Sequence, residues 1–287
     1  MRFRIVESAG RKGIAAARRD GAAWHVLFEG DEGFPGLLDD ILRQGDGALE
    51  LAFAAIERGA ACDPDALDCL PPLVRAGKIL CIGLNFKPHA EEGGAELPDY
   101  PTVFGRFNTG LVAHNRPLVR PKLSDKFDYE SELAVVIGRT ARHVSMAQAL
   151  DHVAGYTIFN DGSIRDYQLR TPQWTIGKNF DGTGGFGPDL VTPDELPAGC
   201  KGLRMVGRFN GEVVQETDLS DMVFDVATLI SLMSAAMTLE PGDVIATGTP
   251  SGVGIVRKPP KLLTEGDVFE IEIERVGTLR NFVVDER

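Results

Sequence analysis

Two glutamates in front of an apolar run are the strongest chemical signal in this sequence. Glu130 and Glu132 lie in K-F-D-Y-E-S-E-L, and A-V-V-I follows directly. Side chains two residues apart share one face of a β-strand, so this spacing places two carboxylates side by side on a strand that is otherwise buried. Buried carboxylates are normally paired, protonated or bound to metal, and hard divalent cations prefer oxygen ligands. The pair indicates a site for Mg²⁺ or Mn²⁺, with Ca²⁺ also compatible; a solvated strand face is the alternative.

A third carboxylate follows the next apolar strand. Asp161 comes directly after V-A-G-Y-T-I-F-N and before a glycine. If this strand lies beside the first one, Asp161 can reach both glutamates and complete a set of three oxygen ligands with open positions for water or substrate. The alternative is an Asp-Gly turn with no ligand role.

A histidine and a glutamate stand three residues apart upstream of these carboxylates. His89 and Glu92 would meet if this stretch forms a helical turn. A carboxylate beside an imidazole orients its tautomer and raises its basicity, which a general base acting on water requires. The alternative is a surface histidine beside acidic residues.

Two further segments carry groups that can hold an anionic oxygen. Lys178 lies between apolar residues in Q-W-T-I-G-K-N-F-D, where a buried ammonium would hold a carboxylate or an enolate oxygen. Thr249 lies in G-D-V-I-A-T-G-T-P-S-G-V-G, a strand that enters a glycine-rich turn with exposed N–H groups. The alternatives are an exposed loop cation and an ordinary turn.

Composition limits the class of protein. The net charge of −12 and the absence of a long Lys/Arg run argue against a nucleic-acid partner, whereas a small anionic substrate needs only a local group of cations. The four cysteines form no C-x-x-C pair, so we expect thiols in a reducing compartment. We find no signal-peptide pattern and no apolar segment of membrane-spanning length, so we expect a cytoplasmic protein with no membrane contact.

The elements that must position these groups are mostly short strands. Thirty-three glycines and seventeen prolines predict many turns. Residues 1–72 are expected to form a small α/β domain, and residues 73–287 a large α+β domain dominated by strands. The expected strands in this order are 3–6, 15–18, 24–28, 78–83 and 153–161, and the expected helices are 34–42, 48–58, 145–152 and 224–237.

Five ordered motifs resemble one protein family. They are G-L-N-F-x-x-H-x-x-E, F-D-Y-E-S-E-L-A-V-V-I-G, G-Y-T-I-F-N-D, W-T-I-G-K-N-F-D and G-D-V-I-A-T-G-T-P-S-G-V-G. Together they resemble the fumarylacetoacetate hydrolase family over about residues 76–283. The resemblance implies a strand-rich α+β fold, a mixed β-roll or sandwich of the C-terminal-domain type of that family, preceded by a small N-terminal domain. It also implies a homodimer.

The resemblance assigns roles to individual residues. It implies that Glu130, Glu132 and Asp161 are metal ligands. It implies that His89 and Glu92 form a water-activating dyad on a lid, which we expect to span residues 86–100. The remaining roles that it implies are substrate-oxygen contacts, and they fall on Lys178, Thr249 and Arg106, the last of these for a substrate carboxylate.

The function expected from these residues is metal-dependent hydrolysis of a C–C bond in a 2,4-dioxo acid, such as an acylpyruvate or fumarylpyruvate. Lys178 would stabilise the enolate that leaves, and His89 would activate water. Within the family, the alternative is a decarboxylase or isomerase of a 2-oxo dicarboxylic acid in aromatic catabolism, with an oxaloacetate-like or hydroxymuconate-type substrate. Outside the enzymes, the alternative is a metal-dependent dicarboxylate binder, which would not need His89.

Overall fold

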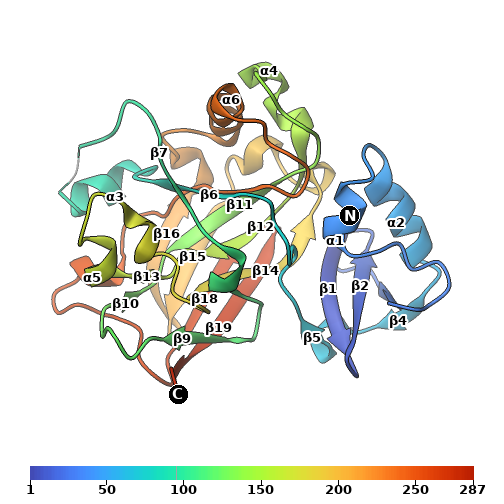
Figure 1. Cartoon of the computed structure of the whole chain (residues 1–287), viewed down its shortest axis with the longest axis horizontal. Helices are drawn as coiled ribbons and strands as arrows, with labels where there is room; N and C mark the ends of the chain where they lie inside the picture. The colour runs from blue at the N-terminus through green and yellow to red at the C-terminus, as the bar shows by residue number, and fades with distance from the viewer. Residues whose placement is uncertain (95) are drawn as a thin grey trace.

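The computed structural model describes residues 1–94 and 96–287. It confirms a strand-rich α+β fold, with a small N-terminal unit beside a larger body (Figure 1). The largest sheet in the described residues has twelve strands. Ten of them follow one another in the order β4 (Ala60–Cys62), β3 (Trp24–Phe28), β2 (Arg11–Ala17), β1 (Arg2–Ser8), β14 (Gly184–Val191), β12 (Val153–Asn160), β11 (Ser131–Ile137), β17 (Val244–Ala246), β6 (Ile79–Gly83) and β7 (Thr102–Gly105). The other two are β5 (Asp68–Cys69), paired with β1, and β8 (Leu111–Val112), paired with β14.

A second sheet packs against the larger body of the first. Its strands are β16 (Glu212–Asp218), β15 (Arg204–Phe209), β18 (Val268–Ile273), β19 (Gly277–Asp285) and β9 (Pro117–Arg120), and a separate short pair is made of β10 (Phe127–Asp128) and β13 (Ser163–Ile164). The main hydrophobic core lies between the two sheets.

Strand β11 is buried on both faces, which explains its uninterrupted apolar run. Leu133, Val135 and Ile137 belong to the core between the two sheets. Ala134 and Val136 belong to a second core, which also contains the helices of the N-terminal unit. The alternation expected from the sequence is confirmed, and it places Glu132 on the face opposite Leu133.

Helices are few and short. They are α1 (Leu38–Leu42), α2 (Ala48–Ile56), α3 (Lys87–Glu92), α4 (Met146–Ala149), α5 (Arg165–Gln168) and α6 (Val226–Ala236). The 3₁₀ turns are η1 (Pro64–Ala66), η2 (Asn108–Gly110), η3 (Leu150–His152), η4 (Trp174–Ile176), η5 (Pro193–Glu195), η6 (Ala198–Cys200), η7 (Leu219–Asp221) and η8 (Gly254–Val256).

Local sequence sets where these helices begin. Helix α6 begins after Asp225, whose carboxylate accepts the N–H of Thr228 as an N-cap. Helix α1 begins later than the expected 34–42, because Pro35 and Gly36 precede it and Gly36 has a φ of 99°, outside the helical range.

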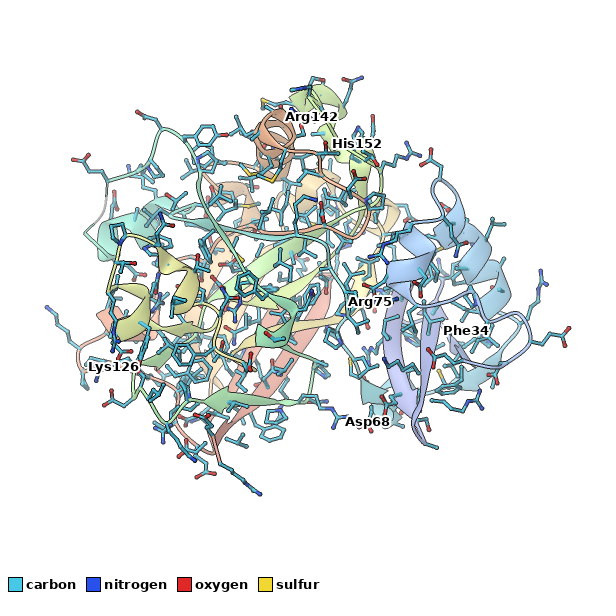
Figure 2. All side chains as sticks on the ribbon, in the orientation of Figure 1. Phe34, Asp68, Arg75, Lys126, Arg142 and His152 are labelled. Carbon is cyan, nitrogen blue, oxygen red and sulfur yellow. The ribbon has the colours of Figure 1, made fainter. Side chains whose placement is uncertain are left out.

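The N-terminal unit continues the large sheet. Strand β1 pairs antiparallel with β14, so the sheet crosses the boundary expected after residue 72. Asp68 and Arg75, labelled in Figure 2 near the junction of the two units, form ion pairs with Arg116 and Asp40 at 3.2 and 3.0 Å. The division into domains 1–72 and 73–287 stays a prediction.

Two further expectations concern single segments. None of the helices formed by residues 1–94 and 96–287 combines the length and the apolar character needed to cross a bilayer.

The expected lid, residues 86–100, contains α3, and it also contains residue 95, which lies outside the described residues. Its closure over substrate stays a prediction.

Candidate active site

The structure brings the three expected metal ligands together. Glu130 precedes β11 and Asp161 follows β12, and the antiparallel register of these strands pairs Ser131 with Asn160. The N–H of Asp161 donates to the carbonyl of Glu130 at 3.0 Å. Carboxylate oxygens of Glu130, Glu132 and Asp161 lie within 4.8 Å of one another, and all three residues are buried.

Two of these carboxylates are balanced by cations. Lys178 Nζ lies 2.7 Å from both Glu130 Oε2 and Asp161 Oδ2. Arg165 Nη1 is 2.6 Å from Glu130 Oε1, and Arg106 Nη1 is 2.6 Å from Asp161 Oδ1. Burial opposes ionisation of Glu130, but Lys178 and Arg165 outweigh it and lower its pKa to about 2.

Among residues 1–94 and 96–287, no cation forms an ion pair with the third carboxylate, Glu132. Glu132 Oε2 accepts the N–H of Gly248 at 2.9 Å. Burial, together with the charges of Asp161 and Glu130, raises the pKa of Glu132 well above its usual range. A divalent cation would supply the positive charge that Glu132 lacks, and the all-oxygen donor set suits Mg²⁺ or Mn²⁺. These residues therefore fit a bound metal.

The expected dyad is formed in helix α3. His89 Nδ1 and Glu92 Oε1 are 2.8 Å apart, and both oxygens of Glu92 accept the N–H of Gly252 at 3.0 and 2.9 Å. Because Nδ1 donates to Glu92, Nε2 is the ring atom that can accept a proton. The loop after β17 thus fixes the carboxylate that orients the imidazole.

A cavity of about 390 Å³ is lined by His89 of the dyad and by Glu130 of the carboxylate cluster, whereas Glu92, Glu132 and Asp161 are not among its lining residues. Its polar lining consists of His89, Glu130, Arg165, Gln168, Lys178 and Thr249. Apolar side chains, among them Phe104, Trp174 and Val253, form the rest of the wall. Gln215 Nε2 donates to Thr249 Oγ1 at 2.9 Å, so the hydroxyl proton of Thr249 remains available to an anionic ligand.

Arg106 lies elsewhere than expected. It is 3% exposed, donates to Asp161, Gly162 and Thr183, and is not among the described residues that line the cavity. These contacts hold the metal-ligand candidate Asp161 in place. A contact between Arg106 and a substrate carboxylate stays a prediction that none of them supports.

The sequence interpretation missed Arg165 and Gln168. Arg165 Nη1 donates to Gln168 Oε1 at 2.9 Å, and Arg165 Nη2 is buried without a hydrogen-bond partner among the described residues. Both side chains line the cavity, so they can bind a carboxylate there. The signal available in the sequence was R-D-Y-Q, an i, i+3 pair that starts four residues after Asp161.

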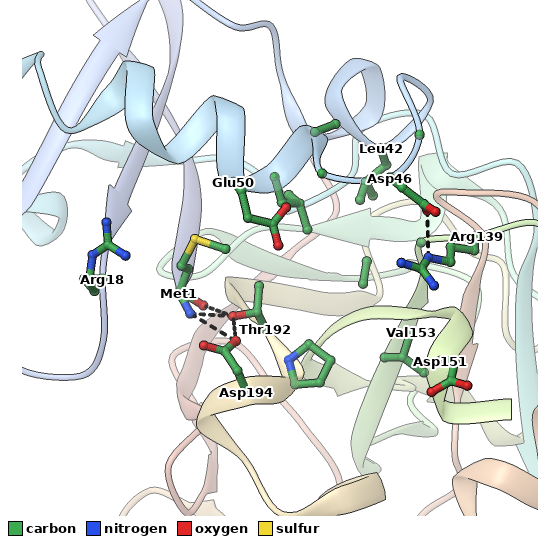
Figure 3. A pocket seen from close by; sticks show the side chains of 17 residues that line it. Met1, Arg18, Leu42, Asp46, Glu50, Arg139, Asp151, Val153, Thr192 and Asp194 are labelled. Atoms are coloured by element: carbon green, nitrogen blue, oxygen red, sulfur yellow. Dashed lines mark hydrogen bonds and ion pairs between the residues drawn. The ribbon is translucent and has the colours of Figure 1, made fainter. Parts of the chain in front are cut away.

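A second cavity, of about 520 Å³, lies between the N-terminal unit and the larger body (Figure 3). Two ion pairs join charged groups of its lining: Arg139 contacts Asp46 at 2.7 Å, and the Met1 amine contacts Asp194 at 3.5 Å. The site residues expected from the sequence, all of which are described, lie outside it. The candidate active site is therefore the smaller cavity.

Comparison with known proteins agrees with this architecture. The family model for the fumarylacetoacetate (FAA) hydrolase C-terminal region matches residues 78–284. The chain belongs to the fumarylacetoacetate hydrolase family, as the five motifs indicated.

Similar proteins are named for different activities. The human protein "Oxaloacetate tautomerase FAHD2A, mitochondrial" is 40% identical over 257 residues, which cover 88% of this chain and 82% of that protein. The fumarylacetoacetate hydrolase from Exiguobacterium antarcticum is 32% identical, with a TM-score of 0.84 and full coverage of both chains. The 5-carboxymethyl-2-hydroxymuconate delta-isomerase from Mycobacterium smegmatis is 31% identical, with a TM-score of 0.78 and full coverage of both chains.

Proposed function

We propose that this protein is a metal-dependent isomerase that interconverts the keto and enol forms of a small 2-oxo dicarboxylic acid of the oxaloacetate type. The observation that carries the proposal is the 40% identity, over 88% of the chain, to a human protein named oxaloacetate tautomerase. The hydrolase reading, first choice from the sequence, is supported less well, because the relatives named here include a tautomerase and an isomerase.

The cavity suits such a substrate. At about 390 Å³ it is small, and Lys178 and Arg165 present cations to it from the carboxylate side. One substrate carboxylate can bind near Lys178 and the other near Arg165, whose Nη2 has no hydrogen-bond partner in the described part of the chain. A divalent cation at Glu130, Glu132 and Asp161 would supply a Lewis acid for the 2-oxo oxygen.

The protein side chains can then move one proton. His89 Nε2 removes a proton from C3 of the keto acid, and the C–H electron pair forms the C2–C3 double bond. The former carbonyl oxygen gains the negative charge, which Lys178 and the Thr249 hydroxyl stabilise until that oxygen takes up the proton from the His89 imidazolium, which restores the neutral base. The apolar wall around Phe104 and Trp174 excludes water from the enolate.

Hydrolysis of a 2,4-dioxo acid is the second candidate, and the geometry of the dyad is compatible with it. A fixed His89–Glu92 pair can also activate water, and the Exiguobacterium antarcticum relative is named a hydrolase. A decarboxylase would use Lys178 as the electron sink and would need no water. A non-catalytic binder would have no use for an oriented dyad.

One experiment separates these functions. Chelator-treated protein is supplied with Mg²⁺ or Mn²⁺ and assayed with oxaloacetate, an acylpyruvate and fumarylpyruvate. Enol absorbance is followed together with the release of CO₂, pyruvate and carboxylic acid. We expect faster keto–enol exchange of oxaloacetate with no new product, relative to a Glu132→Gln control. Stoichiometric carboxylic acid from an acylpyruvate, without acceleration of exchange, would replace the proposal with hydrolysis.

Location and assembly complete the proposal. Cys62, Cys69, Cys81 and Cys200 are free thiols, which suits a reducing compartment. The human relative is named as mitochondrial, so a cytoplasmic location for this chain stays a prediction. A homodimer and a role in aromatic catabolism also stay predictions.

A further inference from the structure

The carboxylate of Asp128 connects two sides of the cavity without lining it. Asp128 is 0% exposed. Its Oδ1 accepts the N–H groups of Tyr129 and Gly254 at 2.9 and 2.7 Å. Its Oδ2 accepts the N–H of Ile255 at 3.0 Å and Arg165 Nε at 2.8 Å. Four donors therefore converge on one buried carboxylate, and they come from three separate segments of the chain.

One of these segments carries the cation of the cavity. Arg165 Nε is held by Asp128, while its Nη1 contacts Glu130 and Gln168. Nη2 is then the nitrogen left to meet a ligand. Because the guanidinium is planar and rigid, the contact of Nε with Asp128 also fixes the direction of Nη2.

Another of these segments, Gly254–Ile255, adjoins the backbone N–H group that holds the His89–Glu92 dyad. Gly254 and Ile255 belong to η8, two residues beyond Gly252, whose N–H holds Glu92. A Cβ at Gly254 would lie 2.1 Å from the carbonyl oxygen of Lys261 and 2.5 Å from Asp128 Oδ1, so the close approach of the backbone to both groups requires glycine. Asp128 thereby fixes the loop on which the orientation of His89 depends.

We propose that Asp128 is a positioning residue. It holds Arg165, the cation that lines the cavity, and the Gly252–Ile255 loop, which supports the His89–Glu92 dyad, in a fixed position relative to each other. The inference rests on the proposed function insofar as both groups act on one bound 2-oxo dicarboxylate. Misplacement of catalytic groups by about 1 Å can lower a rate on the order of 10²-fold, so this relation matters for catalysis.

The test replaces one acceptor oxygen. In Asp128→Asn, an NH₂ group faces donors that the carboxylate satisfied, so either Arg165 or the loop loses its partner. We expect kcat/KM for keto–enol exchange to fall on the order of 10–100-fold, and the affinity for oxalate, measured by calorimetry with Mg²⁺, to fall about tenfold. Asp128→Glu retains the charge but displaces the carboxylate, and we expect it to restore neither quantity.

The matched control is Asp243→Asn. Asp243 is also buried, and it also accepts backbone N–H groups and a cation, from Lys78 and Glu240, at the other end of β17. We expect this variant to lose thermal stability while keeping kcat/KM and oxalate affinity within about twofold.

A double variant tests the route of the effect. If Asp128 acts through Arg165, the losses in oxalate affinity caused by Asp128→Asn and by Arg165→Lys will not add in the double variant. Additive losses, or equal losses of activity in Asp128→Asn and Asp243→Asn, would overturn the proposal. If wild-type protein fails to accelerate exchange but Asp128→Asn still loses oxalate affinity, the proposed function fails and the positioning role stands.

Discussion

The two ends of the neighbouring strands β6 and β17 hold buried charge in different ways. At their N-terminal end, Asp243 is 1% exposed and is matched by Lys78 Nζ at 2.6 Å and by two backbone N–H groups. At their C-terminal end, Glu132 is also 1% exposed but receives one N–H, from Gly248, and faces two other carboxylates. The first arrangement is complete in itself, whereas the second would become complete with a bound cation.

The cations show the same contrast. Lys78 is paired with one carboxylate, whereas Lys178 bridges Glu130 and Asp161, and Arg165 keeps one buried nitrogen without a partner in the described residues. Unsatisfied buried groups of both signs within one region indicate a binding site rather than a structural ion pair. The following predictions test that contrast.

Loss of a proposed metal ligand should have the largest effect. Asp161→Asn removes a charge from the cluster of three carboxylates, and we expect loss of Mg²⁺ binding in calorimetry and a fall in kcat/KM of more than about 10⁴-fold. Asp243→Asn, at the other end of the strands, should leave both within about twofold. Normal metal binding by Asp161→Asn would show that the cluster is not the metal site.

Loss of the base should come next. His89→Ala leaves the carboxylates and Lys178 in place, so we expect proton transfer or hydrolysis to slow by about 10²–10⁴-fold while oxalate affinity is retained. Decarboxylation of oxaloacetate should suffer less from this change and more from Lys178→Ala. Undiminished exchange in His89→Ala, measured by enol absorbance, would assign the base to another residue.

Arg106→Lys should have a moderate effect that distinguishes two roles. The 2.6 Å contact between Arg106 and Asp161 indicates that Arg106 holds this carboxylate in place. Lysine lacks the planar guanidinium that donates to several acceptors at once. We therefore expect Mg²⁺ affinity to fall about 10–100-fold, with little change in KM at saturating metal. A raised KM with unchanged metal affinity would instead support the substrate contact expected from the family resemblance.

The smallest effects should be opposite shifts in thermal stability. In metal-free protein at pH 7, Glu132→Gln relieves a carboxyl whose folded-state pKa is raised by burial and its two acidic neighbours, so we expect Tm to rise by a few degrees. Asp243→Asn removes hydrogen bonds to a charged group. We expect the free energy of unfolding to fall by about 2 kcal/mol, and Tm to fall with it.

The dependence on pH checks this difference. The pKa of Glu132 is higher in the folded state than in the unfolded chain, so this carboxyl destabilises the fold at any pH above its unfolded-state pKa. As pH falls from 7 toward that unfolded-state pKa, Glu132 becomes protonated and the destabilisation disappears. Metal-free wild type should therefore lose less stability over this range than Glu132→Gln, which has no such group. A lower Tm for Glu132→Gln than for wild type at pH 7 would contradict the account of the cluster.

The sequence by itself determined the local parts of this protein. Strand alternation placed Glu130 and Glu132 together, the i, i+3 spacing placed His89 beside Glu92, and the strand that ends in Asp161 supplied the third carboxylate. These groups lie within a few residues of one another or at strand ends, where the periodicity of the backbone fixes the direction of a side chain.

Only the tertiary structure decided which distant groups meet. Asp128 gathers donors from Arg165 and the 254–255 backbone, Arg106 faces Asp161 instead of the cavity, and β1 joins β14 across about 190 residues. The periodicity of the local sequence does not predict these contacts, because each joins distant segments whose buried charged groups pair only after the two sheets have packed.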